Sequence, residues 1–257
     1  MKKEAVKNRF LQYAASFKNG IKEVDINVQL KMDHTLKVLE EAEHLAHEEN
    51  FSPEECVLLE YSCLFHDLSR FEQFAKFQTY NDIISFDHGE RSYELIKESH
   101  WLPEDLSERE RKIILSSVRY HNKRFVPLNL TPEELKILFA VRDADKTDIL
   151  KILLEHLKNP ENPAIVYKLS DFSELSEKVA AAIMAEKSPD NADLETETDF
   201  LAAKFAWGFD LNYGWTCREF LKREYFQKLR KALPEQTEML DICLEKVVKF
   251  IQKKGNV

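Results

Sequence analysis

Apolar residues recur at intervals of three and four along most of the chain, a spacing that places them on one face of an α-helix. The spacing is clearest in EECVLLEYSCLFHD, ERKIILSSVRYH and EELKILFAVRDADKTDILKILLEHL. Each of these segments follows a Ser or Thr that precedes a Glu by three residues, which is the arrangement of a capping box at a helix start. Three helices are therefore predicted to begin at Ser52, Ser107 and Thr131.

The same periodicity predicts further helices before and after these three. They are expected at about 3–17, 25–49, 173–187, 197–208, 215–231 and 235–253, with another beginning at His88. Strand-like alternation is nearly absent, and its one exception, NDIISF at residues 81–86, fits a short strand and a loop equally well. The fold class is therefore predicted to be all-α.

The domain organisation is expected to be simple. The chain contains no internal repeat and no Gly/Ser-rich linker. Its helical pattern is weakest in the polar, acidic stretch 186–198, which contains Pro189. We expect a helical core over residues 1–185, which includes the N-terminal helix, and a C-terminal helical extension over residues 186–257 that packs on the core.

The charge of the chain bears on its partners. There are 37 Lys and Arg against 46 Asp and Glu, a net charge of −9 at pH 7, which repels polyanions and argues against a nucleic-acid partner. The basic stretch 218–231 interleaves aromatic residues with cations, but we interpret it as an amphipathic helix that packs on the bundle. The C-terminal helices offer enough apolar surface for a homodimer.

Glycine and cysteine usage excludes several kinds of site. Only five glycines are present, and neither a GxxxxGK[ST] loop nor a GxGxxG turn occurs, which excludes P-loop kinases, GTPases and Rossmann dehydrogenases. The four cysteines contain no CxxC pair and are interpreted as buried thiols. Glu4 and Lys7 interrupt the apolar run that a signal peptide needs, and no stretch approaches the roughly 18 apolar residues of a membrane span, so a cytoplasmic protein without a membrane partner is expected.

The candidate chemistry begins with a His-Asp pair. His66 and Asp67 end the apolar segment VLLEYSCLFHD, so an imidazole and a carboxylate lie side by side where the chain should be buried. Burial of both groups needs a partner, and a divalent cation supplies one because neutral imidazole and ionised carboxylate are good metal ligands. A helix-terminal His with a capping Asp is the alternative for an isolated pair.

The pair is not isolated. His34 lies close to the apolar stripe of its segment, His88 opens a helix, and His121 ends the apolar helix KIILSSVRYH. Asp143 and Asp145 interrupt ILFAVRDADKTDIL, whose periodicity directs it into the core. Ionisable groups at the ends and inner faces of several helices predict one converging site.

The ordered series His34, His66-Asp67 and Asp145, the last within Ala-Asp-Lys, resembles the HD-domain metal-dependent phosphohydrolases, which are named after that His-Asp pair. The resemblance covers about residues 25–150 and includes LFHDLSRFEQF, FDHGERSYELI, SVRYHN and VRDADKTDIL. It implies an HD-domain helical bundle and the hydrolysis of a phosphate ester. It is specific for the superfamily and carries little information on the substrate.

The resemblance also implies a ligand set for a first divalent ion. Its members are His34, His66, Asp67 and Asp145. Asp143 is the alternative to Asp145, because side chains two residues apart on a helix point about 200° apart and one of the two should face inward. The family's Ala-Asp pair favours Asp145.

His88 and His121 stand at positions that hold a second ion, bridged by the Asp of the His-Asp pair, in binuclear members of the family. In mononuclear members, polar residues there serve the substrate instead. The resemblance therefore implies one or two divalent ions per chain, drawn from Mn, Co, Ni, Fe, Zn or Mg, since such ligands accept several of these metals.

Hydrolysis of a phosphate ester requires activated water and positive charge. A bound divalent ion lowers the pKa of water toward about 7 and polarises a phosphoryl oxygen. Charge that develops on the phosphoryl oxygens is balanced by nearby cations, for which Arg70 and Lys146 are the first candidates, acting together with Asp67. The weaker candidates are Arg91, Lys123 and Arg124.

These observations predict a metal-dependent phosphohydrolase of a small phosphorylated metabolite, with nucleotides as the first expectation. The alternative is a non-catalytic HD module that binds a nucleotide or a partner for signalling, although the loss of ligands that would mark such a module does not occur. A third hypothesis is an oxygen-using di-iron HD enzyme, which would keep the same histidines. The sequence leaves open the exact substrate, the metal and the source of the proton for the leaving group.

Overall fold

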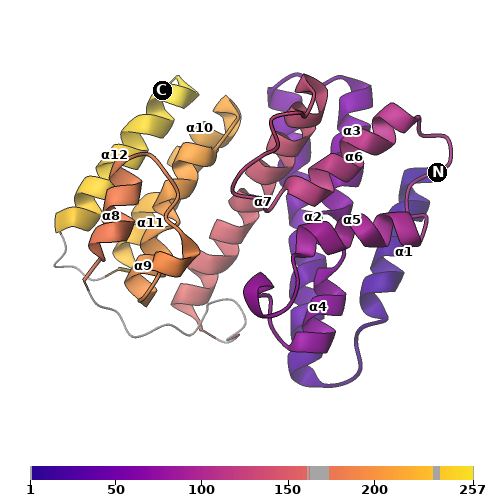
Figure 1. The fold of residues 1–257 in the computed structure, drawn as a ribbon, viewed down its shortest axis with the longest axis horizontal. Helices are drawn as coiled ribbons and strands as arrows, with labels where there is room; N and C mark the ends of the chain where they lie inside the picture. The colour runs from indigo at the N-terminus through magenta and orange to yellow at the C-terminus, as the bar shows by residue number, and fades with distance from the viewer. Residues whose placement is uncertain (1, 161, 163–173, 234–237, 257) are drawn as a thin grey trace. The chain divides into compact units, whose positions relative to one another are not determined.

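The computed structural model describes residues 2–160, 162, 174–233 and 238–256. Their regular structure consists of α-helices and short 3₁₀ helices without a β-strand, which confirms the predicted all-α fold class (Figure 1). The chain divides into two compact units, Met1–Asp148 and Ile149–Val257. Within the described residues, no helix is both long enough and apolar enough to cross a bilayer.

The first unit is a helical bundle. Helix α2 packs against α1, α3 and α4, and α6 packs against both α3 and α5. The elements of this unit are α1 (Lys2–Ala15), α2 (Lys22–Glu48), α3 (Pro53–Phe65), α4 (Arg70–Phe77), η1 (Asp82–Ile84), α5 (His88–Glu98), α6 (Glu108–Tyr120) and the first part of α7 (Pro132–Lys158).

The three predicted capping boxes start helices α3, α6 and α7. In each box the hydroxyl accepts a hydrogen bond from the backbone N–H of the Glu three residues on, and the carboxylate of that Glu accepts one from the backbone N–H of the hydroxyl residue. Two orphan donors of each helix start are thereby satisfied. The pairs are Ser52–Glu55, Ser107–Glu110 and Thr131–Glu134.

The C-terminal end of α3 is buried in the hydrophobic core of the first unit. Phe10, Phe65, Phe71 and Phe74, from α1, α3 and α4, are fully buried. Burial of apolar surface contributes roughly 25 cal/mol for each Å² removed from water, which holds these helices together. Since α3 ends at Phe65 inside this core, the His-Asp pair that follows is buried with it.

Residues 81–86 form a loop that contains the 3₁₀ helix η1 (Asp82–Ile84) and no strand, so the loop interpretation of this segment is correct. The side chain of Asn81 accepts a hydrogen bond from the backbone N–H of Ile83 at 2.9 Å, and the Ser85 hydroxyl donates to the Asn81 carbonyl at 2.7 Å. Local side-chain bonds of this kind satisfy the backbone without a partner strand.

The second unit is arranged around α12, which packs against α8, α10, α11 and η3. A Cβ on Gly208 would lie 2.5 Å from Cγ1 of Val247, so only a glycine lets η3 approach α12 this closely. The elements are α8 (Glu177–Met184), η2 (Asn191–Asp193), α9 (Glu197–Ala202), η3 (Phe205–Asp210), α10 (Gly214–Lys222), α11 (Tyr225–Lys231) and α12 (Glu238–Gly255).

Two predicted helices of this unit are interrupted. The one at 197–208 is divided into α9 and η3, and the one at 215–231 breaks before α11 at Glu224, whose φ is 53°. In one continuous helix Phe220, Tyr225 and Phe226 would point in different directions around the axis. The break lets all three side chains enter the same core. Residues 173 and 235–237 of two other predicted helices lie outside the described residues.

The division into compact units falls within α7, between Asp148 and Ile149. The core over residues 1–185 with an extension over 186–257 stays a prediction. Of the four cysteines, three are buried as predicted and Cys56 is partly exposed.

Candidate metal centre

Two of the predicted site histidines follow directly after a helix and are oriented by it. His66 is the C-cap of α3, and its Nδ1 donates to the carbonyl of Cys63 at 2.7 Å. His121 is the C-cap of α6, and its Nδ1 donates to the carbonyl of Val118 at 2.8 Å. A carbonyl can only accept, so the ring proton lies on Nδ1 and Nε2 carries a lone pair that points away from the helix.

The other two histidines are oriented by carboxylates. Nδ1 of His34 lies 2.7 Å from Oδ2 of Asp148, and Nδ1 of His88 lies 2.5 Å from Oδ2 of Asp82. A carboxylate also takes the ring proton on Nδ1, which leaves Nε2 for a metal. All four rings therefore present the same nitrogen.

The four Nε2 atoms meet in two pairs. Those of His34 and His66 lie 3.3 Å apart, and those of His88 and His121 lie 3.0 Å apart. Lone pairs that face each other repel, and a positive charge between them removes the repulsion. The four rings are almost completely buried, so bulk water does not separate the facing lone pairs. The donor set fits a metal cation at these places.

Asp67 lies between the two histidine pairs and turns one carboxylate oxygen to each. Its Oδ2 is 3.6 Å from Nε2 of His34 and 3.6 Å from Nε2 of His66. Its Oδ1 is 3.5 Å from Nε2 of His88 and 3.9 Å from Nε2 of His121. One carboxylate is thus placed to serve two cation positions.

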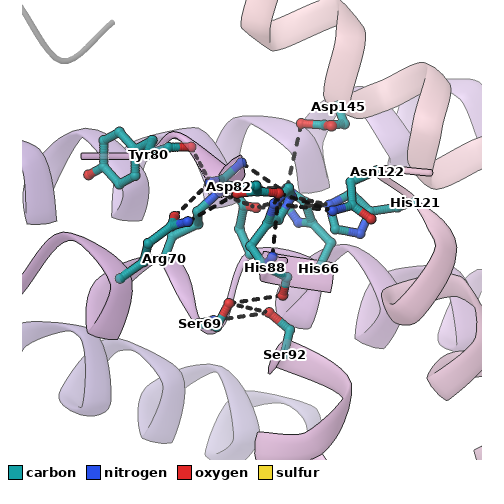
Figure 2. Close-up of polar contacts among 12 residues, drawn as sticks. His66, Ser69, Arg70, Tyr80, Asp82, His88, Ser92, His121, Asn122 and Asp145 are labelled. Carbon is teal, nitrogen blue, oxygen red and sulfur yellow. Dashed lines mark hydrogen bonds and ion pairs between the residues drawn. The ribbon is translucent and has the colours of Figure 1, made fainter. Parts of the chain in front are cut away.

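Asp145, on α7, completes the first of these positions. Its Oδ1 lies 3.1 Å from Nε2 of His34. The same oxygen lies 3.6 Å from Nε2 of His66 (Figure 2). Asp143, the alternative at the sequence level, is fully buried but belongs to neither of the potential metal-holding groups among the described residues. Those groups are His34, His66 and Asp145, and His66, Asp67 and His121. His88 is in neither group, but its Nε2 lies 3.0 Å from that of His121 and 3.5 Å from Oδ1 of Asp67.

The charges of the centre are consistent with a cation site. Burial alone would raise the pKa of Asp67, but Lys31, His66 and Arg70 outweigh it and hold the pKa well below its ordinary value. Burial and the neighbouring histidines lower the pKa of His121 well below its ordinary value, so this ring is neutral. Burial also lowers the pKa of His34, yet Asp145 and Asp148 raise it overall, which marks the space between these groups as one that favours a positive charge.

Two cations contact Asp67. Nε of Arg70 donates to its Oδ1 at 3.3 Å, as expected from a residue three positions later. Nζ of Lys31 donates to its Oδ2 at 2.7 Å. Lys31 was not predicted as a site residue, although it lies three residues before His34, a spacing that puts both on one face of α2.

Arg70 is held from several sides. Its Nη1 donates to the carbonyl of Tyr80 at 2.7 Å, to Oε1 of Gln73 at 2.6 Å and to Oδ1 of Asp82 at 2.9 Å. Its Nη2 lies 3.3 Å from Nε2 of His88. The guanidinium is thereby fixed against the atoms that face the second cation position.

A close approach of α5 to the end of α6 brings His88 and His121 together. A Cβ on Gly89 would lie 2.5 Å from Oδ1 of Asn122 and 2.9 Å from the carbonyl of Arg119, so a glycine is required after His88. Gly89, Asn122, Asp82 and Asp148 were not predicted as site residues, because their roles depend on contacts between elements that are distant in the sequence.

The remaining predicted cations lie in different settings. Lys146 follows Asp145 on α7 and is buried. Arg91 is bound by Glu72, Glu94 and Glu98. Lys123 pairs with Asp87, and Arg124 lies over the ring of Phe125.

Comparison of the sequence with models of known protein families identifies the family of this chain. The model of the HD domain matches residues 32–191. The chain belongs to the HD-domain family. The match covers more than half of the chain and contains all six residues of the two predicted cation positions. HD domains typically bind divalent metals and act as metal-dependent hydrolases. Searches of curated proteins and of solved structures find no match.

Proposed function

We propose that this HD-domain protein is a metal-dependent phosphohydrolase of a small phosphorylated metabolite, with nucleotides as the first class to test. The observation that carries the proposal is the convergence of four imidazole Nε2 atoms on the two oxygens of Asp67 in a buried centre. Imidazole lone pairs that face each other in a buried space cost free energy unless a cation lies between them.

The proposed ligands form two sets that share Asp67. His34, His66 and Asp145 would hold a first divalent ion together with Oδ2 of Asp67. His88 and His121 would hold a second ion together with Oδ1 of Asp67. The nitrogen-rich donor set favours first-row transition ions such as Mn, Fe, Co, Ni or Zn over Mg, which prefers oxygen ligands.

A divalent ion bound by these ligands supplies Lewis-acid catalysis and a nucleophilic water at neutral pH. The chain's own residues supply the rest. Asp148 and Asp82 keep the rings of His34 and His88 in one orientation, and the burial of the centre strengthens every electrostatic interaction within it.

Positive side chains would bind the phosphoryl group. Lys31 and Arg70 lie on either side of the Asp67 carboxylate, one at each oxygen. Cations at these places are suited to balance the negative charge that develops on phosphoryl oxygens during hydrolysis. Lys146 is proposed as a third cation because it follows Asp145 on the same helix.

The test measures metal content and phosphate release together. Metal-free protein is loaded with Mn²⁺, Co²⁺ or Ni²⁺, its bound ions are counted, and a panel of nucleoside phosphates is assayed. We expect one or two ions per chain, and His66→Ala and Asp67→Ala are expected to lose bound metal and to lower phosphate release at least about 100-fold, since even second-shell changes cost 10–100-fold.

His44→Ala is the matched control, because His44 is an exposed histidine of α2 and should leave both readouts unchanged. Bound metal without turnover on any member of the panel would favour the non-catalytic binding module. Absence of bound metal would contradict the proposal.

A further inference from the structure

His88 differs from the other histidines of the centre in how it is oriented. His66 and His121 use carbonyls of the helices that precede them, but His88 is the first residue of α5 and has no preceding helical turn to supply one. The acceptor for its Nδ1 is Asp82, on the short segment 78–87 between α4 and α5. The carboxylate that orients this ring therefore lies outside the α-helices.

Asp82 is bound from three elements (Figure 2). Its Oδ2 accepts from Nδ1 of His88 at 2.5 Å and from Nδ2 of Asn122, after α6, at 3.3 Å. Its Oδ1 accepts from Nη1 of Arg70 at 2.9 Å and from Nε2 of Gln73, on α4, at 3.0 Å. Each oxygen thus holds one member of the site and one supporting amide.

Both site residues that Asp82 holds lie at the second cation position. Nε2 of His88 is 3.5 Å from Oδ1 of Asp67. Nε of Arg70 is 3.3 Å from the same oxygen, and its Nη2 is 3.3 Å from Nε2 of His88. Asp82 therefore fixes a ligand and a cation that face one space.

Segment 78–87 exposes two of its apolar side chains to solvent and directs a carboxylate inward. Ile83 and Ile84, which follow Asp82, are 77% and 66% exposed, while Asp82 is directed inward among polar groups. Burial of two isoleucines in place of one carboxylate would favour the opposite orientation by apolar transfer alone. The contacts of Asp82 with His88 and Arg70 help to hold this orientation, together with the bonds from Gln73 to Ser85 and to the carbonyl of Phe86.

The first cation position has no such dependence. Its histidines are oriented by Cys63 and by Asp148, and Asp145 is on α7. The Asp67 oxygen that faces this position, Oδ2, is bonded by Lys31 of α2, so none of these contacts involves segment 78–87. We propose that Asp82 is a positioning residue for the second ion alone, and that its loss converts a two-ion centre into a one-ion centre. This inference rests on the proposed function.

The test counts ions rather than activity. Metal-free protein is titrated with Mn²⁺, and free Mn²⁺ is followed by electron paramagnetic resonance. The wild-type protein is expected to bind two ions per chain. Asp82→Asn is expected to bind the first ion normally and the second about 10–100-fold more weakly, because His88 and Arg70 bond different oxygens of Asp82 and the NH₂ group that replaces one of them cannot accept. Asp82→Ala is expected to bind one ion.

Asp33→Asn serves as the matched control, since Asp33 is an exposed carboxylate on α2 that bonds Gln29 and should leave both ions in place. Thermal unfolding of the metal-free variants separates positioning from folding. If Asp82 only stabilises its segment, the melting temperature falls and the ion count stays at two, which overturns the inference.

Two further outcomes overturn it: a wild-type protein that binds a single ion, and a variant that loses both ions equally. The parallel assay of phosphate release keeps the two proposals apart. A wild type that binds two ions and releases no phosphate contradicts the proposed function, while the selective loss of one ion in Asp82→Asn would still support the role of Asp82.

Discussion

A metal-ligating histidine almost always donates from its other ring nitrogen to an acceptor, and the four histidines of the candidate centre find that acceptor in two ways. For His66 and His121 the acceptor is a carbonyl of the preceding helix, which no substitution removes. For His34 and His88 the acceptor is a carboxylate, which a substitution can remove. In the second pair, a single substitution of the carboxylate can therefore change the orientation of the ring while the histidine itself is kept.

Asp148→Asn tests this for the first ion. Its Oδ2 lies 2.7 Å from Nδ1 of His34, and the loss of the charge should free the ring and weaken the first ion about 10–100-fold. Competition with a chelator of known affinity measures the effect, and Asp33→Asn, next to His34 on the exposed face, is the control. Unchanged affinity in Asp148→Asn would show that the ring needs no carboxylate.

Candidate site residues could be predicted from the sequence where a titratable side chain stands at the end of an apolar helix. His66 and His121 were identified this way, and the geometry brings both to the centre. Lys31 was missed because a lysine on an amphipathic helix is usually solvated, and Asp82 because its segment has no periodicity from which to read a direction. Contacts between helices decide both cases.

At the scale of the element, Glu134 links the capping of α7 to the packing of α6. It closes the capping box with Thr131, and its carboxylate also accepts from the hydroxyl of Ser116 at 2.6 Å and from Nζ of Lys112 at 3.1 Å. The side chain is 1% exposed. Burial alone would raise the pKa of Glu134, but the bonds from Ser116, Thr131 and Lys112 outweigh it and lower the pKa below 4.5.

Stability should therefore depend on pH through Glu134. Unfolded chains bind the proton first as the pH falls through about 4.5, so the contribution of Glu134 is complete above that value and is lost as the pH falls through its lower folded pKa. Urea unfolding of the wild type and Glu134→Gln should differ by about 1–3 kcal/mol near pH 7. The difference should shrink in acid, and a constant difference would contradict the prediction.

The starts of the helices could be predicted better than their interruptions. Capping boxes such as Ser52–Glu55 are local signals, and the structure forms them where they were expected. The break at Glu224 is set by the need to bury Phe220, Tyr225 and Phe226 in one core, and periodicity within a single segment contains no information on that need.

At the scale of the whole molecule, the proposed ligands all lie within the unit Met1–Asp148. An ion that binds only the folded form stabilises by about 2.7 kcal/mol at 100 times its dissociation constant. Removal of metal with a chelator should therefore lower the unfolding temperature of this unit and leave a transition of Ile149–Val257 unchanged. Scanning calorimetry with and without Mn²⁺ measures both, and equal shifts in both transitions would contradict this expectation.

The extent of the family could be predicted only in part. Motifs with titratable residues carried the resemblance to about residue 150, whereas the HD-domain match continues to residue 191. Among the described residues beyond Asp148, apolar side chains such as Leu150, Val179 and Ile183 fill a core. Such positions accept exchanges between similar side chains, so they leave no short motif to recognise.

The position of Asp67 between two histidine pairs has a consequence for selectivity. With both proposed ions bound, six positive charges, two of them from Lys31 and Arg70, would face four carboxylates, those of Asp67, Asp82, Asp145 and Asp148. Lys146 would add a seventh positive charge. The surplus is positive, so the loaded centre would favour anions over neutral molecules of the same shape.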